Sequence, residues 1–256
     1  MLVLRRWYDF VLVSDAHYAG VRPMGGQRLL QKLLDFHNSK TDLVIVTNSS
    51  HALYLASKGC RAFICADPLP RFMGSEPLTR SLPPKSVFLV CSFDRDEPYE
   101  TAFEAFRRLQ GSGYSLLVSG NFAKAKIKPH KFPWVRFLGF VPEEEYYSTL
   151  RSCSVVMDLT THDDCLVCGA YEAFAAGKPV ILSDTPALRE HFGGAAVLTA
   201  NTPEAIARSV ERAHMQRDVL ALKVVDWNAM YEVQTAQRIA GLKQELSALH
   251  RSAAHN

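Results

Sequence analysis

The sequence lacks long hydrophobic runs. Its apolar stretches, such as 10–13 and 87–91, are far shorter than the ~20 residues that a membrane-spanning helix needs. No secretory leader is expected, because the first four residues are followed at once by Arg5 and Arg6. Without a spanning segment or a leader, the chain is expected to be cytoplasmic.

The sequence has little excess charge of either sign and few cysteines. The formal net charge is +3 and the basic residues are scattered, which argues against a nucleic-acid partner. The densest basic stretch, 124–131, is expected to be a solvated loop, with a phosphate or anionic-membrane contact as the alternative. Six cysteines in 256 residues do not make a disulfide framework. Cys165 and Cys168 have no second Cys-x-x-Cys pair beside them, so we expect neither a metal site nor a redox centre.

What is present is an alternation of short apolar runs with amphipathic segments. The predicted strands are 10–14, 43–47, 62–64, 86–91, 115–119, 135–138, 154–159, 179–182 and 196–198. The predicted helices between them are 26–36, 50–58, 101–110, 143–153, 169–176, 186–192 and 203–215. Strands separated by helices predict an α/β fold with parallel sheets joined by crossover connections.

A proline-rich stretch predicts two α/β units. Residues 1–72 form a partial N-terminal unit, 73–84 a linker, 85–220 the main unit, and 221–256 a C-terminal helix and tail. Because the first unit has so few strands, we expect it either to lean on the second or to lack an N-terminal portion. Its sheet would then expose an edge and apolar faces, which a homodimer would cover.

The segment 158–184 carries the strongest chemical pattern. A strand ends, a loop of hydroxyl and acidic residues follows, and a helix opens near Gly169. The free N–H groups and positive dipole end at a helix start suit a phosphate. Glu172, in the first turn, is placed to accept hydrogen bonds from sugar hydroxyls, and Asp164 from a second sugar. The alternatives are a solvated helix position for Glu172 and a solvated loop for Asp164.

This segment resembles a known signature. Asp164, seven residues, Glu172 and then Gly-Lys-Pro-Val-Ile-Leu-Ser-Asp at 177–184 resemble the acid-x7-Glu motif of retaining GT-B glycosyltransferases of the family 4 type, or group 1. Segments 87–93, 119–121 and 136–141 resemble successive strand ends of that family's nucleotide-binding domain. Segments 10–17 and 43–48 resemble the second half of its acceptor-side domain.

The resemblance implies a GT-B-like fold and a set of roles for individual residues. Glu172 would bind the nucleotide's ribose, and Asp164 would bind the transferred sugar, near which His17 would also lie. The donor phosphates would be bound by the main chain of Leu166, Val167, Cys168 and Gly169. The base would be bound by Gly139 and Phe140. By pattern alone a lone histidine such as His17 is more often structural. No metal or cofactor is implied beyond the nucleotide diphosphate sugar that serves as donor.

Two departures from the family pattern leave alternatives open. Where the family has an Arg and a Lys to hold the diphosphate, this chain has only Arg95, among acidic neighbours. The first half of the N-terminal domain, with its glycine-rich loop, is also not recognisable. These departures favour a nucleotide-binding relative without activity as the alternative to an enzyme. A GT-B sugar epimerase is the third hypothesis.

The resemblance also suggests partners. It implies a bacterial polysaccharide or glycoconjugate pathway with a glycan or lipid-linked acceptor. Enzymes of this kind are often peripheral on the inner membrane face. The basic helix over 26–40, with Arg28, Lys32 and Lys40, would contact anionic lipid there, and an ordinary solvated face is the alternative.

Overall fold

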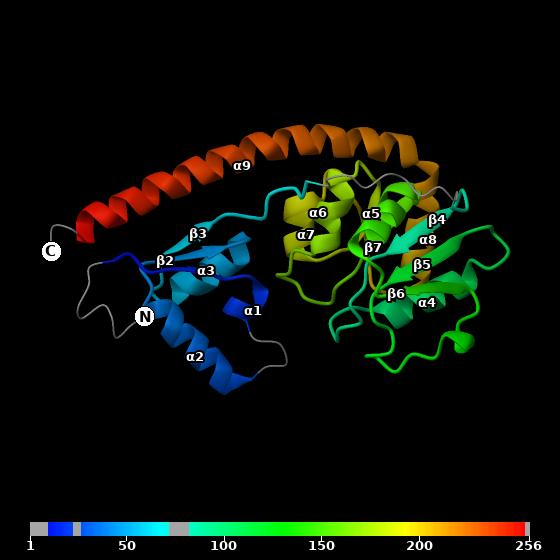
Figure 1. Cartoon of the computed structure of the whole chain (residues 1–256), viewed down its shortest axis with the longest axis horizontal. Coiled ribbons are helices and arrows are strands. Elements are labelled where there is room, and N and C mark those ends of the chain that lie inside the picture. Colours follow the sequence, from blue (N-terminus) through cyan, green and yellow to red (C-terminus); the bar gives the residue numbers. More distant parts are fainter. Residues whose placement is uncertain (1–9, 23–26, 72–81, 254–256) are drawn as a thin grey trace. The chain divides into compact units, whose positions relative to one another are not determined.

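A computed structural model describes residues 10–22, 27–71 and 82–253. Contacts divide the chain into two compact units, one of residues 1–68 with 231–256 and the other of residues 69–230. Figure 1 shows helices and strands in both units. Most of the predicted linker, 73–84, falls outside the described residues. No helix among those described is long and apolar enough to cross a membrane.

The first unit is built on a three-stranded parallel sheet in the order β1-β2-β3. The strands are β1 (Val13–Asp15), β2 (Leu43–Val46) and β3 (Ala62–Ile64), and the helices are α1 (Tyr18–Val21), α2 (Arg28–Ser39) and α3 (Ser49–Ser57). β1 begins later than the predicted strand 10–14, because the Leu12 N–H donates to the Asp42 carboxylate at 2.7 Å instead of joining the ladder. The core of this unit includes Val44, Val46 and Leu55.

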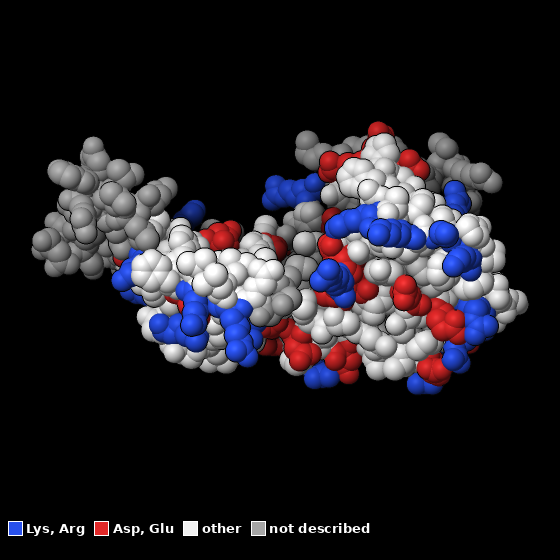
Figure 2. Space-filling model, turned by 90° about the horizontal axis from the view of Figure 1, so that it is seen from below, with Lys and Arg blue, Asp and Glu red and all other residues white. Residues whose placement is uncertain are grey.

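Helix α2 presents an unusual outer face. Leu29, Leu33 and Phe36 recur at helical spacing and are 74%, 57% and 58% exposed, and Arg28 and Lys32 lie on the same helix. Figure 2 shows Lys and Arg among uncharged surface on the part of the first unit that carries α2. The predicted lipid contact of this helix stays a prediction.

The second unit is a six-stranded parallel sheet in the order β6-β5-β4-β7-β8-β9. Its strands are β4 (Ser86–Leu89), β5 (Ser115–Ser119), β6 (Val135–Gly139), β7 (Val155–Asp158), β8 (Val180–Ser183) and β9 (Val197–Thr199). Its helices are α4 (Tyr99–Arg108), η2 (Pro129–Lys131), α5 (Glu143–Ser152), α6 (Cys168–Ala175), α7 (Pro186–Phe192) and α8 (Pro203–Met215). β4 and β7 are almost completely buried, as expected of central parallel strands covered on both faces.

Helices cover both faces of this sheet. Figure 1 shows α5, α6 and α7 on one side and α4 with α8 on the other.

Two of these helices begin or end at the capping residues that the sequence predicts. The Thr202 hydroxyl accepts from the Ala205 N–H at 3.3 Å and caps α8, as predicted. Gly177, at φ +68°, follows α6, and this turn lets the N–H groups of Gly177 and Lys178 donate to the last carbonyls of the helix. The prediction of an α/β fold with two parallel units is confirmed.

Helix α9 (Arg217–Ala253) is longer than the helix that the sequence pattern predicts, 226–250. In its first part the Trp227 indole N–H donates to the His191 carbonyl at 3.1 Å, within the second unit. In its second part the Tyr231 hydroxyl donates to the Asp67 carbonyl at 2.6 Å, and Arg61 pairs with Glu245. The residues from Tyr231 onward therefore belong by their contacts to the first unit.

Candidate functional site

The strand order of the second unit places a crevice between β4 and β7. The chain runs outward from β4 through β5 to β6, then returns to β7 and continues in the opposite direction to β9. In such sheets the connections leave β4 and β7 on opposite faces, and ligands bind beyond the carboxyl ends of the two strands. A cavity of about 940 Å³ lies at this place, lined by Cys91 after β4 and by Asp158 and Thr160 at the end of β7.

Close packing of α6 against the strands shapes one wall of the cavity. α6 begins at Cys168, and a Cβ on Gly169 would lie 2.5 Å from Asp158 Oδ2 and 2.8 Å from Val90 Cβ. Only glycine fits there. The Gly169 N–H donates to the Asp158 carboxyl. The predicted phosphate-binding segment lines the same wall with Leu166, Val167, Cys168 and Gly169.

Asp158 is a buried acid at the base of this wall. Burial raises its pKa well above the ordinary carboxyl value of 3.8, and the nearby charges of Glu97, Glu172 and Asp96 raise it further. The Gly169 N–H opposes that shift by stabilising the carboxylate. The carboxyl therefore favours its neutral form over a wider pH range than an exposed aspartate does.

Glu172 lines the cavity from α6, but because the helix begins at Cys168 it lies beyond the first turn in which it was predicted. The Tyr146 hydroxyl, from α5, donates to its Oε2 in a short hydrogen bond. Burial raises the pKa of Glu172, while the Tyr146 bond lowers it. Burial and the Glu172 charge raise the pKa of the Tyr146 phenol, which keeps it a donor. A carboxylate held in this way has further lone pairs to offer to a ligand's hydroxyls.

The loop after β7 is fixed by polar contacts between neighbouring strand ends. The Thr160 N–H donates to Ser183 Oγ at 3.0 Å, and Ser183 Oγ donates to Asn201 Oδ1 at 2.7 Å. The Asn201 side-chain amide donates to the Thr160 carbonyl at 2.8 Å. The Thr160 hydroxyl reaches Asp96 Oδ2 at 3.2 Å. These contacts hold the ends of β7, β8 and β9 in register beneath the cavity.

The predicted base-binding residues lie at the end of β6. Gly139 adopts φ +79°, and Phe140, which follows it, is 90% exposed while lining the cavity. An aromatic ring this exposed on a cavity rim has a face available to stack on a planar group. Tyr147 of α5 lines the same cavity.

Three predicted site residues lie outside this lining. Asp164 and Arg95 are not among the described residues that line the cavity, although each is close in sequence to residues that do. His17 belongs to the first unit, where it is the N-cap of α1. Its ring nitrogens lie 3.8 Å from carboxylate oxygens of Asp15 and Asp67.

Sequence reasoning missed several lining residues. Asp158, Glu97 and Tyr146 were not predicted as site residues, and Lys124 was placed in a solvated loop. Lys124 is the one Lys or Arg among the described lining residues, and its Nζ is paired with Asp94 at 2.7 Å. The position of Asp158 at the end of a strand beside the loop is a signal that could have found it. The Tyr146–Glu172 bond joins residues 26 apart and leaves no local signal.

The described cysteines are free thiols. Burial and nearby acids raise the pKa of Cys165 to about 12, so its thiol is poorly nucleophilic. Among the described residues, no group of three or more His, Cys, Asp or Glu side chains is arranged to hold a metal ion.

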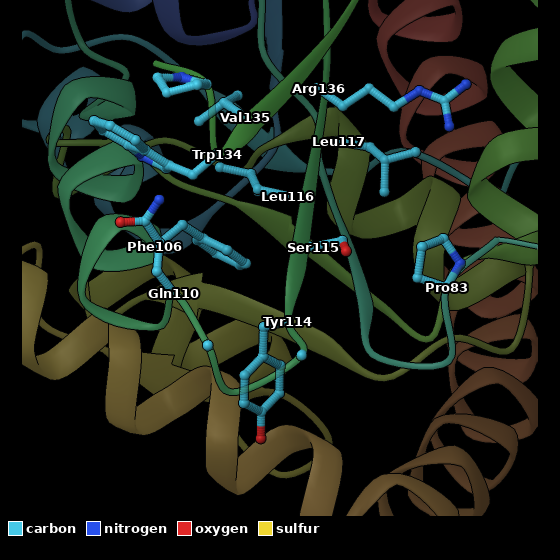
Figure 3. A pocket seen from close by; sticks show the side chains of 13 residues that line it. Pro83, Phe106, Gln110, Tyr114, Ser115, Leu116, Leu117, Trp134, Val135 and Arg136 are labelled. Carbon is cyan, nitrogen blue, oxygen red and sulfur yellow. The ribbon is translucent and has the colours of Figure 1, made fainter. Parts of the chain in front are cut away.

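A second cavity, of about 590 Å³, lies at the opposite ends of the strands (Figure 3). It is lined by Pro83, before β4, by Ser115, at the start of β5, and by Trp134, before β6. Figure 3 shows Phe106 and Trp134 on one side of β5 and Arg136 on the other. Its lining includes no carboxylate, and it lies away from the strand ends where α/β sheets bind ligands.

Comparison with protein families finds a match for the second unit. A family described as glycosyl transferases group 1 matches residues 84–216, which is just over half of the 256 residues and contains the whole lining of the larger cavity. No curated protein matches the chain.

Solved structures share the fold at low sequence identity. Sucrose-phosphate synthase from Thermosynechococcus elongatus matches with a TM-score of 0.74 and 20% identity, over 96% of this chain and 70% of that one. Anabaena Alr3699/HepE in complex with UDP and glucose matches with a TM-score of 0.72 and 15% identity, over 91% of this chain and 71% of that one. An α,α-trehalose-phosphate synthase from Burkholderia vietnamiensis matches with a TM-score of 0.66 and 12% identity, over 88% of this chain and 64% of that one.

Proposed function

The chain belongs to the group 1 glycosyltransferases, and on that premise we propose that it transfers a sugar from a nucleotide diphosphate sugar to a glycan or lipid-linked acceptor, with retention of configuration. Its fold is that of GT-B glycosyltransferases, as the sequence resemblance predicted. The observation that carries the proposal is the cavity between β4 and β7, with the Glu172 carboxylate and the start of α6 on one wall.

The donor would bind in this cavity through three kinds of contact. Glu172 accepts from the ribose hydroxyls with the lone pairs that Tyr146 leaves unused. Phe140 stacks on the base. The main chain at 166–168 and the dipole of α6 stabilise the phosphates and, during transfer, the negative charge on the leaving diphosphate. UDP is the first candidate, because HepE binds it in a related fold.

The test is calorimetric titration of the chain with UDP, GDP and ADP, repeated on Glu172→Ala. We expect one nucleotide to bind, and the variant to lose about 1–3 kcal/mol of binding free energy because the ribose hydroxyls lose their buried acceptor. Glu144→Ala is the matched control, since Glu144 is an exposed acid of α5 that does not line the cavity. Equal losses in both variants, or no binding of any nucleotide, would contradict the donor site.

Transfer is tested separately from binding. We propose that His17 and Asp164 act on the transferred sugar, as the resemblance implies. His17→Ala and Asp164→Asn are then expected to lower the rate of transfer by at least about tenfold, as in the loss of a positioned polar group, while UDP affinity stays unchanged. The rate is measured as release of nucleoside diphosphate in the presence of acceptor. A parallel loss of UDP affinity would show that these residues support the donor site instead.

One observation favours a second candidate, a nucleotide-binding protein without turnover. Glu97, Asp158 and Glu172 line the cavity, and the single described cation of the lining, Lys124, is already paired with Asp94. An anionic leaving group would find little positive charge there. Binding of the diphosphate without release of sugar from any donor sugar would identify this function.

A further inference from the structure

The loop between β4 and α4 closes around the carboxylate of Glu97. The Ser92 N–H lies 3.0 Å from both Oε1 and Oε2, and the Asp94 N–H lies 2.9 Å from Oε2. Two main-chain donors, two residues apart, therefore point at one carboxylate.

The backbone conformation explains why these N–H groups converge. Phe93, between them, has φ +62°, in the left-handed region that a bulky residue rarely adopts. Its buried side chain packs on Tyr99 with ring centroids 5.1 Å apart, which holds the conformation. A turn of this kind makes a concavity of N–H groups that binds anions. In this chain the anion is its own Glu97.

Side chains complete the enclosure of Glu97. The Ser92 Oγ lies 2.9 Å from Glu97 Oε1 and 2.8 Å from Asp94 Oδ2, so its one proton is shared between the two carboxylates, and the Cys91 thiol lies 3.3 Å from Glu97 Oε2. Burial and the Glu97 charge raise the pKa of Cys91, so the thiol keeps its proton and acts as a donor. The carboxylate is thus held by main-chain N–H groups, a hydroxyl and a thiol together.

This loop is part of the proposed donor site. Cys91, Ser92 and Glu97 line the same cavity as Glu172 and the start of α6. Lys124, which also lines the cavity, forms an ion pair with Asp94. A phosphate that approached the loop would meet a carboxylate where it would otherwise meet converging N–H donors.

We propose that Glu97 sets the affinity of this cavity for phosphates, by occupying with its own carboxylate an anion site that a donor phosphate would otherwise fill. The inference rests on the proposed donor site. It implies that the Glu97 carboxylate reduces what the diphosphate adds to nucleotide binding beyond the base and ribose. Like charges brought together at an interface oppose binding, so removing the carboxylate is expected to strengthen diphosphate binding.

The experiment measures what the diphosphate contributes. Each nucleoside (uridine, guanosine, adenosine), its diphosphate and inorganic pyrophosphate are titrated calorimetrically into the wild-type chain, Glu97→Gln and Glu97→Ala. The ratio of nucleoside Kd to diphosphate Kd is expected to rise about tenfold or more in the variants, in keeping with relief of like-charge repulsion. Pyrophosphate is expected to bind Glu97→Ala more tightly than wild type. Glu100→Gln is the matched control, because it removes the same charge from an exposed residue outside the lining.

Two readouts guard against a misfolded variant. Thermal unfolding without ligand reports the fold, and nucleoside affinity reports an intact cavity. Glu97→Gln keeps the shape of the side chain and carries the test if Glu97→Ala does not fold.

The outcomes separate this inference from the donor site. If nucleosides bind all variants equally and the ratio does not rise, Glu97 only shapes the loop, and the inference is wrong while the donor site stands. If no nucleoside or nucleotide binds but pyrophosphate binds Glu97→Ala alone, the anion site is supported and the proposed function fails. If nothing binds any variant, both are wrong.

Discussion

Gly169 and Asp158 are so close that a Cβ on the glycine would lie 2.5 Å from Oδ2 of the aspartate. The Gly169 N–H donates to the same carboxyl. The start of α6 and the end of β7 therefore meet through main chain on one side and a buried acid on the other. This contact brings the α6 wall of the cavity against the central strands.

Replacing Gly169 with alanine should destabilise the protein. The new methyl would overlap the buried Asp158 and the partly buried Val90, so we expect a loss of about 1–3 kcal/mol, as for overpacked cores. Gly194→Ala is the control, because a Cβ there meets nothing within 4 Å. Urea unfolding measures both. Equal stability of the two variants would show that α6 has room to shift.

Gly120, at the end of β5, is constrained in a second way. It has φ +96°, and a Cβ would lie 1.9 Å from the Cys91 carbonyl oxygen. Gly111→Ala, at φ +83° with nothing within 4 Å, shares the backbone strain of about 1–2 kcal/mol without the clash. We expect Gly120→Ala to unfold at clearly lower urea concentration than Gly111→Ala, or not to fold. Matching midpoints would mean that only the backbone angle matters.

The sheet of the second unit could be predicted because its strands are continuous apolar runs. β5 and the helices α7 and α8 have the predicted bounds, since turn and cap residues such as Thr202 and Pro186 mark them locally. The start of β1 could not be predicted. It depends on the Asp42 carboxylate capturing the Leu12 N–H from 30 residues away.

Helix α9 shows a different limit of sequence reasoning. Its buried stripe, Leu220, Val224, Trp227 and Tyr231, has helical spacing. Several other apolar residues on the helix are exposed, among them Val219, Leu222 and Val233, and they hide the period. The helix was therefore predicted too short.

The candidate site was predictable where its parts are contiguous. The segment 166–172 was singled out because loop, helix start and acid follow one another, and residues 166–169 and Glu172 line one cavity. Glu97 and Tyr146 were missed because their importance comes from contacts that the fold creates. Their partners are a backbone turn and Glu172, neither of which is visible as a spacing.

Phe140 provides a test of base recognition. Because the ring is 90% exposed, Phe140→Ala should change the free energy of unfolding little, yet weaken nucleotide binding by about 1–3 kcal/mol if a base stacks on it. Phe36→Ala, the same truncation at an exposed position of α2, is the control. Calorimetry with the bound nucleotide measures both. Unchanged affinity in Phe140→Ala would place the base elsewhere in the cavity.

Asp158 should make stability depend on pH. Its pKa in the folded chain is raised well above 3.8, so the native state keeps a proton that the unfolded chain has already lost. This contribution to stability is fully present below the unfolded pKa and is lost as pH rises through the folded pKa, with a slope of at most about 1.4 kcal/mol per pH unit. Asp158→Asn cannot ionise and keeps an oxygen to accept from the Gly169 N–H. It should be more stable than wild type at pH 8, with the difference shrinking toward pH 4. Urea unfolding across this range, with Asp163→Asn as an exposed control, measures the slope. A pH-independent difference between Asp158→Asn and wild type would mean that Asp158 is ionised in the native state throughout.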